Sequence, residues 1–140
     1  MSILSDAAFR LPIRVYIEDT DAGGIVYYVN YLKYMERART EFMRALGFDK
    51  AGMMDELTMF VVHGLTVDYH KPATLDDELT ATAVVETFKR ASMMFEQRIF
   101  RGNELLCSAR VSVACVHPDT RKPRAIPAEV REALAQIRSA

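Results

Sequence analysis

One long stretch of helical periodicity, followed by four stretches of strand periodicity, constrains the fold of this chain more than any other feature. From Tyr28 to Leu46 apolar side chains recur at steps of three and four residues, and Gly47 is a natural end for such a helix. About nineteen residues at 1.5 Å each make a helix of roughly 28 Å. A helix of that length is usually wrapped by a larger element, and the sequence that follows predicts strands.

Alternation of apolar and polar residues predicts a sheet around this helix. Ile13, Val15 and Ile17 indicate an early strand. The four later strands are expected at Met59 to Tyr69, Leu79 to Phe88, Met93 to Phe100 and Leu105 to Val116. A short helical piece is expected around Asp49 to Glu56, and a last helix from about Ala128 to Ile137. We therefore predict an α+β fold with an antiparallel five-stranded sheet wrapped around one long central α-helix, in a single domain over residues 1–140 with a core from about 11 to 127.

Charge and cysteine usage exclude several classes of function. Eighteen Lys and Arg stand against nineteen Asp and Glu, so no global field would attract nucleic acid or an anionic membrane. No apolar run approaches the roughly 20 residues of a bilayer span, and the first residues lack the pattern of a signal peptide. Cys107 and Cys115, in one predicted strand, would lie roughly 26 Å apart, too far for a disulfide. We expect reduced, buried thiols in a cytoplasmic protein without membrane insertion.

The segment from Glu18 to Tyr28 contains the residues best suited to chemistry. Backbone N–H groups in the first turn of a helix have no intrahelical acceptor and carry partial positive charge, so they can polarise a carbonyl. Asp21 lies shortly before the predicted helix, where its carboxylate could attack a carbonyl or take a proton from water. An Asx turn or a helix cap would suit Asp21 equally well. Gly23 and Gly24 would let a substrate approach the main chain without meeting a Cβ.

Metal binding is not predicted. Glu18 and Asp19 do not continue into the spaced series of oxygen ligands that a hard cation requires. His63, His70 and His117 are scattered and lack the paired spacing of zinc ligands. His63 shares the apolar parity of its strand, so we expect a core or interface residue there.

Basic clusters and strand length suggest contacts with other molecules. Lys89–Arg90 and residues 121–124 are either solvated surface or contacts for phosphate oxygens. Strands of eleven or twelve residues expose long edges, which small proteins commonly manage by pairing with another subunit. We expect a dimer at least.

Several segments together match one known family. They are Val15 to Tyr28, Asn30–Tyr31, Glu36 to Glu41, Val67 to Ala73, Gln97 to Ile99 and Lys122 to Pro127. In these segments the chain resembles the hotdog-fold acyl-CoA thioesterases, in the branch that contains 4-hydroxybenzoyl-CoA thioesterase and the YbgC-type enzymes associated with the Tol-Pal system. The likeness extends from about Leu11 to Pro127. The YbgC-type branch generally carries His where this chain has Tyr28, and the hydroxybenzoyl-CoA enzyme resembles this chain there.

The resemblance implies roles for individual residues. Asp21 would be the catalytic aspartate, as nucleophile or general base, and the N–H of Tyr28 would polarise the thioester carbonyl. The active site would lie between two subunits of a homodimer or homotetramer. The residues expected to bind substrate are Gly23, Gly24, Val26, Lys89, Arg90 and Ser92.

The function predicted from these features is hydrolysis of an acyl-CoA to a free acid and CoA, without metal or other cofactor. The acyl group would be short or aromatic, and an acyl-carrier-protein thioester is an alternative substrate. A non-catalytic acyl-CoA-binding subunit, or a Tol-Pal-associated interaction subunit with the same fold, is the alternative function. A hotdog dehydratase would need a histidine near the central helix, and no histidine precedes His63.

Overall fold

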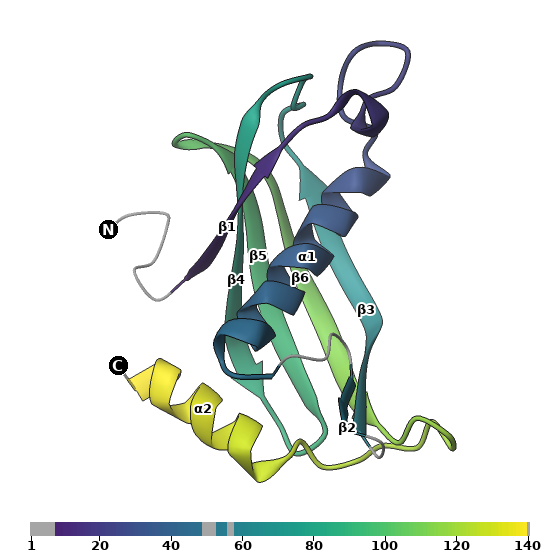
Figure 1. The fold of residues 1–140 in the computed structure, drawn as a ribbon, viewed down its shortest axis with the longest axis vertical. Coiled ribbons are helices and arrows are strands. Elements are labelled where there is room, and N and C mark those ends of the chain that lie inside the picture. The colour runs from purple at the N-terminus through teal and green to yellow at the C-terminus, as the bar shows by residue number, and fades with distance from the viewer. Residues whose placement is uncertain (1–7, 49–52, 56–57, 140) are drawn as a thin grey trace.

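One antiparallel sheet and two helices organise the chain (Figure 1). The computed structural model describes residues 8–48, 53–55 and 58–139. In chain order the elements are β1 (Phe9–Arg14), the 3-10 turn η1 (Ile17–Asp19), α1 (Val29–Ala45), β2 (Met53–Asp55), β3 (Thr58–Tyr69), β4 (Glu78–Phe88), β5 (Ser92–Arg101), β6 (Glu104–Val116) and α2 (Ala128–Ser139). The strand order is β1-β4-β5-β6-β3-β2, with every neighbouring pair antiparallel. The predicted α+β architecture is confirmed, and β2 adds a short sixth strand to the five expected.

The core lies between α1 and the sheet face that it crosses (Figure 1). The buried apolar residues of α1 follow the predicted period: Tyr31, Tyr34, Met35, Ala38 and Phe42. On β4 the small side chains of Ala81 and Ala83 are fully buried, which lets the helix lie close to the sheet. Phe42 meets Phe95 of β5 edge to face, with ring centroids 5.7 Å apart. None of the described helices is long and apolar enough to cross a membrane.

Among the buried polar residues, Gln97 connects the helix to the sheet. Gln97 of β5 has no exposed surface, and its Nε2 donates to the carbonyl oxygens of Met35 (2.9 Å) and Thr82 (3.2 Å). Its Oε1 accepts from Nη1 of Arg39 at 2.9 Å. These hydrogen bonds join α1 to β4 and β5, and they satisfy the Gln97 amide where it has no exposed surface.

The first strand is shorter than predicted. β1 ends at Arg14, and Ile17 lies in η1 with 76% of its surface exposed. The chain bends because the Asp19 carboxylate accepts the N–H of Tyr16 at 2.9 Å, a local side-chain bond that competes with strand pairing. The expectation that Ile17 continues the strand is wrong. After the bend the chain continues through the glycine loop to the start of α1.

The prediction of a short helix around Asp49 to Glu56 is also wrong for the residues of that segment that the structure describes, 53–55. Residues 53–55 form β2, which pairs with the start of β3, and the rest of that segment lies outside the described residues. Pairing with β3 explains the difference, since three residues take strand geometry when a neighbouring strand offers hydrogen bonds.

A β-bulge changes the parity of β3. The pairing of β3 with β6 shifts between Val62 and Gly64, so His63 turns to the sheet face away from α1. There it is exposed, and its Nε2 lies 2.7 Å from the Ser112 hydroxyl. The core alternative for His63 is therefore wrong, because a bulge reverses the inward and outward alternation that the prediction assumed.

Beyond β2, β3 forms an open edge of the sheet. The exposed residues of β3 include the large side chains of Val62, Leu65 and Tyr69. β3 follows β6 in the strand order, and among the described residues its other neighbour is β2, which pairs with its first two residues. A long apolar edge of this kind is a surface that another strand can cover.

Candidate active site

The acidic glycine loop is a tight turn between η1 and α1. A bridge joins Thr20 to Val26, and inside it the N–H of Asp21 donates to the Ile25 carbonyl at 3.0 Å. Gly24 has a φ of +81°, in the left-handed region that favours glycine. Val26 itself is 3% exposed, and its N–H donates to the Ala73 carbonyl at 2.8 Å. The loop is thus fixed to the core at its end while its tip faces outward.

Asp21 lies at the exposed tip of this turn. Its Oδ1 accepts the N–H of Gly23 at 2.8 Å, so the Asx turn that the sequence left open as an alternative is present. A Cβ added at Gly23 would stand 3.3 Å from the same oxygen, so a larger residue would crowd the carboxylate. The second oxygen, Oδ2, accepts no hydrogen bond from the described residues and remains available to a substrate or a water molecule.

Tyr28 stands at the N-cap position of α1. No acceptor within the described part of the chain takes its N–H, whereas the N–H groups of Tyr27 and Asn30 are both hydrogen-bonded. The Tyr28 ring is 57% exposed and lies 5.0 Å from the Tyr27 ring. An unsatisfied N–H at the positive end of a 17-residue helix is suited to a carbonyl or an anion.

Tyrosines from β3 and α1 support this helix start. Tyr69 Oη donates to the Tyr28 carbonyl oxygen at 3.2 Å, and the two rings meet edge to face at 5.9 Å. Tyr31 Oη accepts the N–H of Ala73 at 2.9 Å. Burial raises the pKa of both Tyr31 and Tyr69, so both hydroxyls stay protonated at neutral pH.

Tyr34 lies one turn further along α1. Its hydroxyl is fully buried and has no hydrogen-bond partner within the described residues. Burial raises its pKa, and the nearby Asp19 carboxylate raises it further. Tyr34 is therefore a neutral packing residue.

Asp19 and Asn30 are contacts of the site to which sequence reasoning gave no role. The Asp19 carbonyl oxygen accepts the N–H of Tyr27 at 2.9 Å and Nδ2 of Asn30 at 2.8 Å. An asparagine in the first turn of a helix is the signal that could have pointed to them, since that residue type often bonds to local backbone.

The predicted nucleotide contacts lie elsewhere in the single chain. Lys89 and Arg90 are exposed in the turn between β4 and β5, which the N–H of Lys89 closes by donating to the Ser92 carbonyl at 2.8 Å. The glycine loop adjoins the opposite end of β4, where the N–H of Val15 donates to the Asp77 carbonyl. Eleven residues of strand, or about 35 Å, separate the two ends. One chain alone does not bring Asp21 and this turn together.

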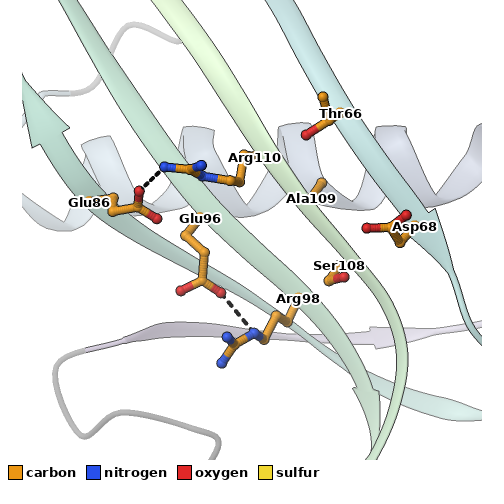
Figure 2. Close-up of a pocket in the computed structure, with 8 residues that line it drawn as sticks. All are labelled: Thr66, Asp68, Glu86, Glu96, Arg98, Ser108, Ala109 and Arg110. Atoms are coloured by element: carbon orange, nitrogen blue, oxygen red, sulfur yellow. Dashed lines mark hydrogen bonds and ion pairs between the residues drawn. The ribbon is translucent and has the colours of Figure 1, made fainter.

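A hollow lies on the sheet face that points away from α1. Figure 2 shows this space of about 330 Å³, with α1 behind the strands. Four of its five charged side chains form ion pairs, Glu86 with Arg110 and Glu96 with Arg98, and the fifth is Asp68. The N–H of Tyr28 and the carboxylate of Asp21 are not part of it. In the described residues, no group of three His, Cys, Asp or Glu side chains could hold a metal ion.

Comparison with known proteins identifies the family. The family model described as "Thioesterase superfamily" matches residues 23–108. The chain is 45% identical over 134 residues to the acyl-CoA thioesterase YbgC of Haemophilus influenzae, covering 95% of this chain and 98% of that protein. It is 44% identical over 128 residues to the acyl-CoA thioester hydrolase YbgC of Escherichia coli O157:H7, covering 91% and 96%.

A solved structure agrees with these matches. The crystal structure of a probable thioesterase from Bartonella henselae superposes with a TM-score of 0.77 at 34% identity, over 87% of this chain and all of that one. Both the predicted fold and the predicted family are thereby confirmed. This chain belongs to the thioesterase superfamily, in its hotdog-fold branch.

Proposed function

We propose that this chain hydrolyses the thioester of an acyl-CoA, with Asp21 as nucleophile or general base and the Tyr28 N–H as the donor to the thioester carbonyl. The observation that carries the proposal is the N–H of Tyr28 at the start of α1, which no acceptor in the described part of the chain takes and which follows directly after the loop that bears Asp21. The names of the YbgC relatives, which describe acyl-CoA thioesterases, support the substrate class.

The chemistry needs only these two groups and water. When the thioester carbonyl accepts the Tyr28 N–H, negative charge developing on its oxygen is stabilised at the helix start. Asp21 then either attacks the carbonyl carbon to form an anhydride and release the thiolate, after which water opens the anhydride at the acyl carbon, or takes a proton from the attacking water. In both routes the carbon–sulfur bond breaks, the carbonyl carbon gains the water oxygen, and the thiol leaves with a proton.

A second copy of the chain would complete the site. Asp21 is exposed in the single chain, and β3 presents an open apolar edge. Antiparallel pairing of two β3 edges would place the β4–β5 turn of one copy toward the end of the sheet that holds Asp21 in the other. Lys89 and Arg90 of that turn would then be available for the phosphates of CoA. This arrangement supports a homodimer, or a homotetramer built from two such dimers.

The proposal extends to the acyl group and to the molecule that carries it. The exposed side chains of Tyr27, Tyr28 and Tyr69 at the start of α1 suit a short or aromatic acyl group, because aromatic side chains offer flat apolar contact. Acyl carrier protein is the alternative carrier, since its thioester has the same reacting bond. Cys107 and Cys115 are buried thiols rather than a disulfide, which is consistent with the proposed cytoplasmic location.

The test is thiol release from a panel of acyl-CoAs by the purified protein and by Asp21→Asn. We expect kcat to fall by about a hundredfold or more in Asp21→Asn while affinity for the acyl-CoA is retained. Glu18→Gln is the matched control, because Glu18 is an exposed carboxylate in the adjoining η1 turn and should leave kcat unchanged.

Two results would contradict the proposal. Wild-type kcat in Asp21→Asn would remove Asp21 from its role. Tight binding of CoA without hydrolysis of any thioester in the panel would instead favour the non-catalytic acyl-CoA-binding subunit.

A further inference from the structure

Three hydrogen bonds close a ring around the peptide that bears the Tyr28 N–H. The N–H of Tyr27 donates to the Asp19 carbonyl at 2.9 Å, and the N–H of Asn30 donates to the Tyr27 carbonyl at 2.8 Å. Nδ2 of Asn30 donates to the Asp19 carbonyl at 2.8 Å and completes the ring. Each of the three residues is therefore bonded to the other two, with Tyr28 between them in sequence.

This ring determines where the Tyr28 N–H points. The peptide between Tyr27 and Tyr28 is planar and trans, so its C=O and its N–H point in opposite directions. Because the N–H of Asn30 holds that C=O, it also sets the direction of the Tyr28 N–H. The Asn30 side chain is 8% exposed, so water competes little for its bond to Asp19.

Asp19 is itself held from the other side. Its carboxylate accepts the N–H of Tyr16, and its own N–H donates to the Tyr16 carbonyl at 3.0 Å. The ring is thus attached to η1 at the end of the first strand. A shift of Asn30 would be transmitted to the Tyr27–Tyr28 peptide rather than absorbed by Asp19.

We propose that Asn30 is a positioning residue whose side-chain amide keeps the Tyr28 N–H aimed at the bound thioester carbonyl. This inference rests on the proposed function, in which that N–H is the polarising donor. Asn30 touches no reacting atom; it acts through the Asp19 carbonyl and the Tyr27–Tyr28 peptide. A purely structural role for Asn30 would lower stability and leave the kcat of the folded enzyme unchanged.

The first test compares Asn30→Ala with Phe42→Leu. Phe42 is buried on the same helix, three turns away from the ring, so its truncation lowers stability without touching the donor peptide. We expect kcat to fall about tenfold to hundredfold in Asn30→Ala with a smaller change in KM, because misplacing a donor affects the transition state most. Phe42→Leu should keep its kcat below its melting temperature. Wild-type kcat in Asn30→Ala, or an equal loss in Phe42→Leu, would overturn the inference.

The second test uses the pH profile of Asn30→Asp. An ionised carboxylate cannot donate to the Asp19 carbonyl, whereas a protonated one can. The ratio of Asn30→Asp to wild-type kcat should therefore rise as the pH is lowered toward about 5, while the ratio for Asn30→Ala stays flat. Parallel profiles for the two variants would count against donation by this side chain.

A third measurement separates this inference from the proposed function. In an Asp21→Asn background the bound acyl-CoA accumulates, and the infrared stretch of its thioester carbonyl reports polarisation by the donor. Adding Asn30→Ala should reduce the shift to lower frequency; an unchanged shift would overturn the inference while Asp21 keeps its role. If Asp21→Asn still hydrolyses acyl-CoA, the proposed role of Asp21 is wrong, and kcat of Asn30→Ala alone decides the positioning role.

Discussion

Replacing Gln97 by leucine should show how strongly α1 is tied to the sheet. The substitution removes two hydrogen bonds to backbone carbonyls and one from the Arg39 guanidinium. A neutral hydrogen bond contributes about 1 kcal/mol and one to a charged group about 2 kcal/mol, and the apolar side chain regains about 1 kcal/mol through burial. Burial also lowers the pKa of Arg39, which is consistent with a guanidinium that is partly desolvated where it donates to Gln97. We expect a net loss of about 3 kcal/mol.

Urea unfolding at one fixed protein concentration measures this loss, because self-association would otherwise shift the midpoint. Met94→Leu is the control on the same strand, since Met94 pairs with Ser112 on the face away from α1 and should change stability by less than about 0.5 kcal/mol. A double-mutant cycle with Arg39→Leu should show coupling of about 1 kcal/mol or more. A loss below about 1 kcal/mol for Gln97→Leu, or an additive cycle, would refute the assignment of this contact as the main polar tie.

Three further predictions concern single positions. Gly24→Ala should cost about 1 to 2 kcal/mol in urea unfolding because Gly24 has a φ of +81°, and an unchanged midpoint would contradict that conformation. Burial raises the pKa of Asp77, but hydrogen bonds from the Thr74 N–H and from Arg101 lower it overall. Since the folded pKa lies below the unfolded one, this stabilisation is present above about pH 4 and is lost as the pH falls. Asp77→Asn should therefore be less stable than wild type by about 1 kcal/mol at neutral pH, with the difference vanishing near about pH 2. Burial raises the pKa of Cys107 to about 12, so its thiol should react with a disulfide reagent only on unfolding; rapid labelling of the native protein would show that it is accessible.

Local patterns in the chain were sufficient for the helix and the long strands. The three- and four-residue period from Tyr28 to Leu46 corresponds to α1 at Val29–Ala45, and Gly47 takes a φ of +101° just after it. The expected start of the third strand at Leu79 lies within one residue of β4 at Glu78. These features follow from near-neighbour periodicity, which needs no knowledge of distant contacts.

Hydrogen bonds and strand pairings that the apolar pattern does not encode decided the parts that differed. The alternation in β3 predicted an inward His63, but the bulge against β6 turned it outward. The run through Ile17 looked like a strand, but the Asp19 carboxylate bent the chain after Arg14. The apolar pattern predicts neither outcome, because each depends on which group forms a hydrogen bond with the backbone.

In the candidate site, too, some features follow from the sequence alone and others only from the tertiary structure. Sequence alone determined the residue types that the proposed chemistry uses, a carboxylate at Asp21 and a helix start at Tyr28, because both depend on local order along the chain. Only the tertiary structure revealed that Asp19 and Asn30 meet around the Tyr27–Tyr28 peptide, whose N–H has no acceptor among the residues that the structure describes. The physical reason is that the direction of an N–H depends on the donor that holds the carbonyl of the same peptide, and folding brings that donor into place.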